Sequence, residues 1–133
     1  MKCLIVEDDP ISSQVLKGLM SRYARDADVV INGQEGIDWF LQGHASKSPY
    51  DLILMDIMMP ETNGLQSALI IREKEVLLNI SFMSRVKIIM VTALDDPRTV
   101  MKALYDSAAD CYLIKPIKLL DLEDELRKLQ LIE

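Results

Sequence analysis

The stretch DLILMDIMMP, residues 51–60, decides the fold and raises a question of chemistry. Its apolar run, 52–55, has no alternation of polar and apolar residues, which is typical of a parallel strand covered on both faces. The run ends on Asp56, and the chain turns shortly afterwards at Pro60. A carboxylate at the end of a buried strand is costly unless its charge is used. We therefore expect Asp56 to have a chemical role.

Strand patterns and helix patterns alternate along the rest of the chain. Apolar runs of the same kind lie at residues 3–6, 87–91 and 111–114, with a weaker run at 27–31. Helical spacings of three or four separate them, as in Ile11, Val15 and Leu19 and later in Leu119, Leu122, Leu126 and Leu129. Five such alternations predict an α/β fold, a doubly wound parallel sheet of five strands with helices on both faces.

Composition and charge narrow the classes of protein. The chain has 133 residues, 50% hydrophobic and 27% charged, which is typical of one globular domain. The net charge of −6 disfavours nonspecific binding to nucleic acid or an anionic membrane. No apolar stretch approaches the roughly 20 residues that cross a bilayer. Cys3 and Cys111 lie far apart in apolar runs, so we expect buried thiols and a cytoplasmic protein. We expect His44 to lie in a solvated loop without a catalytic or metal-binding role.

Polar residues follow the predicted strands at their carboxyl ends, where ligands bind in doubly wound sheets. They are the acids Glu7, Asp8, Asp9 and Asp56, the hydroxyl of Thr92 and the ammonium of Lys115. Carboxylates that lie close together repel unless a cation neutralises them, and Mg²⁺ suits carboxylates with water and a phosphate. A cation and an ammonium beside a carboxylate are what phosphoryl transfer to aspartate requires, with Asp56 as the nucleophile.

Each of these residues also has a plain structural interpretation when it is taken alone. Asp9, before Pro10, would cap a helix. Thr92 would cap or turn the chain, and Lys115 would be a surface charge. Their placement at the ends of successive strands makes coincidence a poor explanation.

Four motifs taken together resemble the receiver domain of two-component response regulators: LIVEDDP, DLILMDIMMPETNG, VTA and LIKP. The resemblance runs from about Lys2 to the last helix. It implies a flavodoxin-like fold with strand order 2-1-3-4-5 and phosphorylation of Asp56 by a sensor histidine kinase or a histidine phosphotransfer protein. It also implies a signalling switch rather than an enzyme, a domain that catalyses only its own phosphorylation and dephosphorylation.

The resemblance also implies a magnesium site. Asp8, Asp56 and the backbone carbonyl of Met58 would hold Mg²⁺ directly, and Glu7 would act through water. Asp9 becomes the ligand if the register is shifted by one residue.

Further residues match the pattern of the family around the phosphoryl group. Thr92 matches the switch hydroxyl, Lys115 the lysine of the site, and Pro116 the proline of a cis peptide. Tyr112 takes the place of the switch aromatic, although a plain core aromatic would explain it as well. The small Ala93 leaves room for the phosphoryl group. Two further residues shape the loop behind the acceptor, Pro60 and Gly64.

We expect residues 1–133 to form a single receiver domain that signals through contacts with an output protein. We expect a stand-alone receiver similar to the chemotaxis regulators, and the alternative is a piece of a longer protein. The resemblance also allows a homodimer that depends on phosphorylation. The segment 73–85, EKEVLLNISFMSR, lengthens the region before the fourth strand. We expect it to extend the third helix and pack on its own domain, and the alternative is a surface for a partner.

Two rival functions share parts of this pattern. A small flavin-binding electron carrier has the same fold class, but the acids of EDDP would repel a flavin phosphate. A phosphatase with an aspartate nucleophile would carry a second acid two residues after Asp56, where this chain has Met58.

Overall fold

The computed structural model describes residues 1–59, 62–93 and 97–133. Its five-stranded parallel sheet has the order β2-β1-β3-β6-β7. The strands are β1 (Cys3–Val6), β2 (Asp28–Val30), β3 (Leu52–Asp56), β6 (Lys87–Thr92) and β7 (Cys111–Ile114). Counted within the sheet, this is the order 2-1-3-4-5, and each predicted run lies within one residue of an observed strand. The predicted fold is confirmed.

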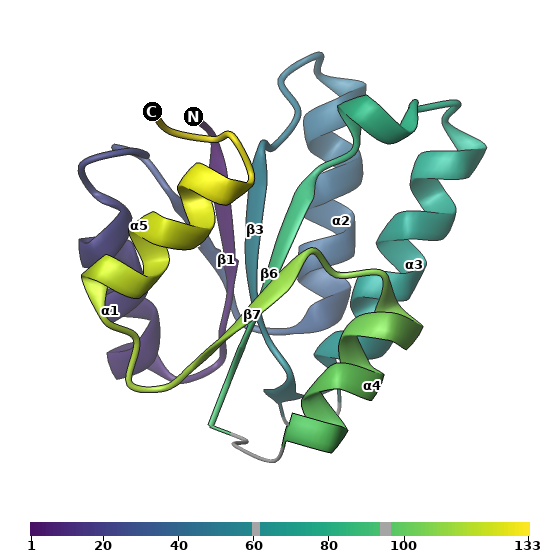
Figure 1. The fold of residues 1–133 in the computed structure, drawn as a ribbon. Coiled ribbons are helices and arrows are strands. Elements are labelled where there is room, and N and C mark those ends of the chain that lie inside the picture. The colour runs from purple at the N-terminus through teal and green to yellow at the C-terminus, as the bar shows by residue number, and fades with distance from the viewer. Residues whose placement is uncertain (60–61, 94–96) are drawn as a thin grey trace.

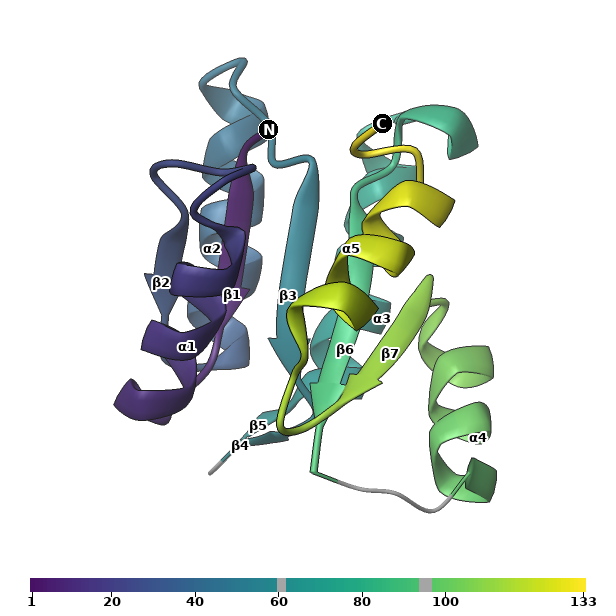
Figure 2. The same cartoon turned by 60° about the vertical axis from the view of Figure 1, so that its left-hand side comes forward.

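Helices cover both faces of the sheet (Figure 1). One face carries α1 (Pro10–Met20) and α5 (Leu119–Lys128), and the other carries α2 (Gly33–Ala45), α3 (Gly64–Leu77) and α4 (Pro97–Ser107). Figure 2 shows α4 beside the edge strand β7. Two small elements were not predicted from the sequence. They are the antiparallel hairpin of β4 (Met58–Met59) and β5 (Thr62–Asn63), and the 3-10 helix η1 (Phe82–Ser84).

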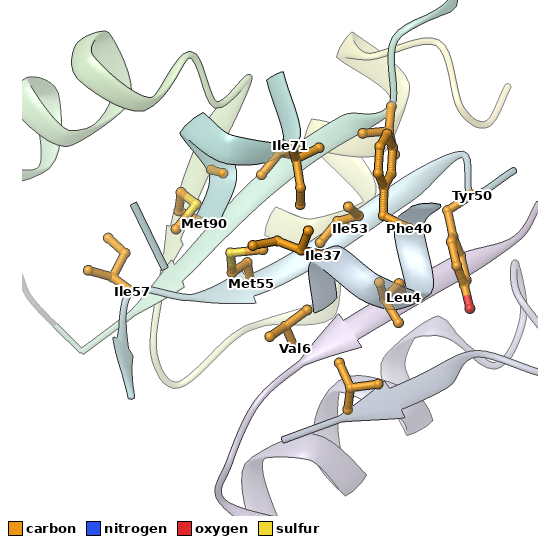
Figure 3. Packing of buried hydrophobic residues seen from close by; sticks show 14 of the residues in the cluster. Leu4, Val6, Ile37, Phe40, Tyr50, Ile53, Met55, Ile57, Ile71 and Met90 are labelled. Atoms are coloured by element: carbon orange, nitrogen blue, oxygen red, sulfur yellow. The ribbon is translucent and has the colours of Figure 1, made fainter. Parts of the chain in front are cut away.

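Alternate side chains of each strand enter two cores on opposite faces of the sheet. Leu4 and Val6 pack with Phe40 of α2 and Ile71 of α3 (Figure 3). Ile5, between them in sequence, packs into the second core with residues of α1 and α5. Because both faces are covered, the strands contain continuous apolar runs instead of an alternating pattern.

The apolar spacing in α1 predicts the helix correctly but not its buried face. Ile11 is 75% exposed and Val15 is 51% exposed, whereas Leu16 and Met20 are buried. Two apolar stripes run side by side on this helix, and packing on the sheet covers only the second.

The segment 73–85 does lengthen α3, which continues to Leu77. The expectation that its apolar residues pack on the domain is wrong, because Leu77 is 73% exposed, Phe82 70% and Met83 85%. Ala68 and Ile71 already fill the inward side of α3, and the helical period turns Leu77 to the outer side.

The expectation of a loop histidine is also wrong. His44 lies in the last turn of α2 and is half-buried. Its ring packs edge-on against Phe40, with 4.9 Å between the ring centroids. The Asn32 cap and the buried face of α2 stabilise the helix. It therefore continues to Ala45, although the composition of residues 42–49 is polar. Cys3 and Cys111 are both free, as expected, but only Cys3 is buried, and Cys111 is half-buried on the edge strand β7.

Candidate functional site

The register of the parallel strands brings the predicted residues to one edge of the sheet. Pairing of β1 with β3 places Glu7 beside Asp56, just past the last paired residues. Pairing of β6 with β7 places Lys115 one residue beyond the partner of Thr92, and the Lys115 amide donates to the Thr92 carbonyl at 2.7 Å. Four side chains from four strand ends therefore share this edge.

Three carboxylates gather at the centre of this edge. Glu7, Asp8 and Asp56 each offer an oxygen, and these oxygens all lie within 4.8 Å of one another. Glu7 is only 1% exposed and Asp56 7%, whereas Asp8 reaches solvent. Within the described ranges this is the one group of acids, histidines and cysteines with such spacing.

Asp9 lies outside this group. Its carboxylate accepts hydrogen bonds from the backbone amide of Ser12 at 3.1 Å and from the Ser12 hydroxyl at 2.8 Å, so it caps α1. These hydrogen bonds lower the pKa of the Asp9 carboxyl. The geometry therefore shows Asp9 as a helix cap before Pro10, which is the plain structural interpretation of this pair.

Lys115 is the cation of the site. Its Nζ lies 2.6 Å from Glu7 Oε1 and 3.4 Å from Asp56 Oδ2. Burial alone would lower the pKa of the ammonium, but the hydrogen bond to Glu7 and the charge of Asp56 outweigh it and raise the pKa. Lys115 is therefore a permanent positive charge beside Asp56 at neutral pH.

The acids carry more negative charge than Lys115 neutralises. Burial raises the pKa of the Glu7 carboxyl, and Asp56 adds to the effect although the hydrogen bond from Lys115 opposes it. A hard divalent cation with oxygen ligands would remove this repulsion, and Mg²⁺ is suited by such carboxylates. The backbone of Met58 borders the same place, since its amide donates to Asp56 Oδ1 at 3.2 Å. The residues present therefore fit a magnesium ion.

Gly64 lies directly behind Asp56. Its amide donates to the carbonyl of Ile57 at 2.9 Å. A Cβ at this position would lie 2.1 Å from the backbone oxygen of Asp56, so only glycine fits this close approach. Pro60, the other residue predicted to shape this loop, lies outside the described residues.

The remaining predicted residues surround the carboxyl ends of β6 and β7. Thr92 is fully buried, and Ala93 directly after it is exposed. The peptide between Lys115 and Pro116 is cis, as the resemblance to receiver domains implies. Tyr112 is half-buried. Tyr112 and Leu104 of α4 each pack against the core of that face, and both line a hollow of about 540 Å³ between α4, β7 and α5. Its position thus suits both a core aromatic and one that borders an open space.

Sequence reasoning missed an apolar groove beside the site. The groove has a volume of about 300 Å³ and adjoins Lys115, and its apolar lining includes Ile11, Val15, Pro116 and Ile117. The signal that could have found it is the exposed apolar stripe of α1, with Ile11 and Val15, which the core does not need.

Fold and site together define a class of protein. It is a doubly wound domain whose buried strand-end aspartate is flanked by two further acids and a lysine. Among the residues that the structure describes, no helix is long and apolar enough to span a membrane.

Comparison with known families agrees with this definition. The response regulator receiver domain matches residues 3–127, and the chain belongs to this family. Receiver domains are the signalling domains of two-component systems, and histidine kinases or phosphotransfer proteins phosphorylate them on an aspartate. The flavin carrier and the phosphatase are set aside by this membership.

Relatives and solved structures give the same result. The chain is 34% identical over 120 residues to the uncharacterized transcriptional regulatory protein YcbL of Bacillus subtilis, covering 90% of this chain and 46% of that protein. It is 33% identical over 128 residues to the transcriptional regulatory protein PcoR of Escherichia coli, covering 96% and 50%. The chain thus spans about half the length of these relatives.

Two solved receiver domains superpose closely. The receiver domain of Saccharomyces cerevisiae Ssk1, crystallised with the histidine phosphotransfer signalling protein Ypd1, has a TM-score of 0.80 and 28% identity, covering 97% of this chain and 88% of that one. The receiver domain of the histidine kinase CKI1 from Arabidopsis thaliana, complexed with Mg²⁺ and BeF₃⁻, has a TM-score of 0.82 and 25% identity, covering 97% and 89%.

Proposed function

We propose that Asp56 is the phosphoacceptor of this receiver domain and that the chain is a phosphorylation-controlled switch. The observation that carries the proposal is the contact of Lys115 with both Asp56 and Glu7, at 3.4 and 2.6 Å, inside a group of three carboxylates. A nucleophilic carboxylate needs positive charge around the incoming phosphoryl group, and this edge supplies it.

The transfer step follows from this geometry. An oxygen of Asp56 attacks the phosphorus of a phosphohistidine while the P–N bond breaks, and the electron pair returns to the imidazole nitrogen, which takes up a proton. The Lys115 ammonium stabilises the charge on the transferred oxygens, and the Thr92 hydroxyl donates a hydrogen bond to one of them. Magnesium held by Asp8, Asp56 and the carbonyl of Met58, with Glu7 acting through water, would supply further positive charge.

The apolar groove beside Lys115 supports a protein donor. Ile11 and Val15 are exposed on α1, next to Pro116 and Ile117, and they offer apolar area to a helix that carries the donor histidine. Such docking would place the phosphohistidine over the adjoining site. A sensor histidine kinase or a histidine phosphotransfer protein is the partner that fits, and the Ssk1 receiver domain was crystallised with a protein of the second kind.

The signal leaves the domain through contacts with an output protein. A phosphoryl group adds up to about two negative charges, which would draw in Thr92 and Lys115. Ala93 leaves room for the group, and Tyr112 would follow Thr92 inward from the hollow beside α4. A homodimer that forms on phosphorylation is one form that such contacts can take. The net charge of −6 supports an output without nucleic acid contacts by this domain.

The signal ends when water hydrolyses the acyl phosphate, so this chain catalyses only the gain and loss of its own phosphoryl group. Met58, 64% exposed, can neither accept a proton nor orient the attacking water. Slow dephosphorylation follows. Residues 1–133 act as a single domain in this proposal, and the cytoplasmic location expected from the cysteines stays a prediction.

Incubation with a small phosphodonor and Mg²⁺ tests the proposal. The wild-type protein should gain one phosphoryl group, and Asp56→Asn should gain none, because the amide is a far poorer nucleophile. Asp38→Asn, a change at an exposed position on α2, is the matched control and should be labelled normally. Normal labelling of Asp56→Asn would place the acceptor elsewhere.

A further inference from the structure

A cluster of charged side chains lies under the turn that joins α4 to β7 (residues 108–110), and the site around Asp56 does not include it. The cluster consists of two arginines and two acids, which balance in charge: Arg72, Glu75, Arg85 and Asp110. Arg72 is 8% exposed and Glu75 3%. Charges this deep are stable only when ion pairs and hydrogen bonds surround them, so the cluster fixes the segments that it joins.

Arg72 is the centre of the cluster. Its Nε donates to the carbonyl of Ala108 at 3.0 Å, and its Nη2 pairs with Asp110 at 3.0 Å. Its Nη1 donates to Glu75 at 2.7 Å and to the carbonyl of Val86 at 2.8 Å. A planar guanidinium makes such a set of directed bonds, which the single ammonium of a lysine does not reproduce. Through Arg72, α3 therefore holds both the turn 108–110 and the residue before β6.

Asp110 bonds the same turn to β6. Its carboxylate accepts from the amide of Ile88 at 2.8 Å, and its own amide donates to the carbonyl of Ile88 at 2.9 Å. Its second oxygen pairs with Arg85 at 3.2 Å. The turn is therefore held through its backbone and its side chains at the same time.

The backbone of Ala108 shows how strongly this turn is constrained. Its φ of 56° lies in the left-handed region, which glycine commonly occupies at the end of a helix and alanine rarely does. Such a conformation persists only where the surrounding contacts impose it. The bonds of Arg72 and Asp110 impose it here, so the turn 108–110 is a fixed point of the fold.

The rest of α4 is held less firmly. Among its side chains that the structure describes, only that of Val100 is buried, whereas Met101 is 61% exposed and Tyr105 89%. Figure 2 shows the helix running from the end of the molecule where β6 finishes to the turn before β7. Its N-terminal end therefore lies on the side of Thr92, and its C-terminal end is held by Arg72.

We propose that the turn 108–110 is a fixed pivot and that phosphorylation moves the N-terminal end of α4 around it. This rests on the proposed function, because the phosphoryl group is what draws in Thr92 before α4. The helix has 11 residues and is about 16 Å long, so a rotation of about 7° about the pivot moves its first turn by roughly 2 Å. Arg72 is a positioning residue that confines the movement to the N-terminal end.

Residual dipolar couplings, which report the directions of the backbone N–H groups, test the pivot by NMR. BeF₃⁻ with Mg²⁺ serves as the mimic of the phosphoryl group, and fluorine NMR confirms that the mimic is bound. In the wild-type protein, the N–H groups of α4 should turn by several degrees relative to the sheet. Those of residues 108–110 should keep their directions, because the cluster holds them in both states.

Arg72→Lys tests the guanidinium. In the resting protein, the amides of Ile88 and Asp110 should exchange with solvent at least about tenfold faster, after correction for the amides of β1. With the mimic bound, residues 108–110 should turn together with α4, a readout that a loss of stability alone would not move. Asp110→Asn keeps the side-chain shape and carries the same test if Arg72→Lys does not fold. Arg127→Lys is the matched control, since this arginine on α5 is 50% exposed, and should change neither readout.

The outcomes separate the pivot from the proposed function. A wild-type protein in which residues 108–110 turn together with α4 would overturn the pivot and leave the switch in place. Unchanged exchange at Asp110 in Arg72→Lys would do the same. If α4 did not turn at all with the mimic bound, both the switch and the pivot would be overturned.

Discussion

Replacing Gly64 with alanine should displace the aspartate that we propose as the phosphoacceptor. The added Cβ would lie 2.1 Å from the backbone oxygen of Asp56, 3.0 Å from its carbonyl carbon and 3.1 Å from Cα of Ile57. These atoms belong to the backbone and cannot rotate away, so the chain after β3 must move by about 1 Å to reach ordinary contact distance. The hydrogen bond from the Gly64 amide to the Ile57 carbonyl, 2.9 Å long, would be strained by the same movement.

The effect should appear in stability and in phosphorylation. Overpacking against a rigid neighbour and a weakened buried hydrogen bond together amount to about 2–4 kcal/mol of the free energy of unfolding. A displacement of about 1 Å at a reacting group lowers its rate by about 10²-fold. Urea unfolding followed by circular dichroism measures the first quantity, and labelling with a small phosphodonor and Mg²⁺ measures the second.

Gly18→Ala provides the matched control. Gly18 is exposed in α1, and a Cβ there would meet nothing within 4 Å. The same substitution should therefore stabilise the protein by about 0.5–1 kcal/mol and leave phosphorylation unchanged. If Gly64→Ala matched Gly18→Ala in both assays, the close approach behind Asp56 would not constrain the site and the reasoning would be refuted.

Three further outcomes are expected. Asp8→Ala should weaken Mg²⁺ binding in calorimetry and slow phosphorylation by about tenfold or more. Asp9→Ala should mainly loosen the cap of α1. If Asp9→Ala impaired Mg²⁺ binding and Asp8→Ala did not, the ligand set would be shifted by one residue. Met58→Asn combined with Leu94→Glu, the second at a position outside the described residues, should speed decay of the acyl phosphate by about 10²-fold, and unchanged decay would show that other groups control it. Amide hydrogen exchange around Tyr112 should change when BeF₃⁻ and Mg²⁺ bind, and unchanged protection with the mimic bound would remove the proposed switch.

The fold could be predicted from the sequence because its strands are covered on both faces. Each apolar run lacks alternation, and helical spacing between the runs predicts a doubly wound sheet, whereas the order of its strands was implied by the resemblance to receiver domains. The site was predictable for a related reason. Parallel strands bring their carboxyl ends to one edge of the sheet. The backbone positions of Glu7, Asp56, Thr92 and Lys115 are therefore neighbours at this edge.

Local packing determines which carboxylate caps α1 and which face of a helix is buried, and neither could be predicted from the sequence. Asp8 and Asp9 are adjacent carboxylates, and only the hydrogen bonds to Ser12 show which one caps α1. Both stripes of α1 are apolar, so the period alone does not tell that Ile11 faces solvent while Leu16 faces the core. The exposure of Leu77 depends in the same way on which side of α3 meets the sheet, because this helix carries apolar residues on both sides.

Mapping the phosphorylated residue tests the central claim most directly. After reaction with a small phosphodonor and Mg²⁺, borohydride reduction converts an acyl phosphate into a stable alcohol whose position tandem mass spectrometry identifies in the digested protein. We predict reduction at Asp56, and its loss when Mg²⁺ is removed by a chelator. Reduction at Asp8 or Asp9 with Asp56 unmodified, or a phosphoryl group found on His44, would contradict the account.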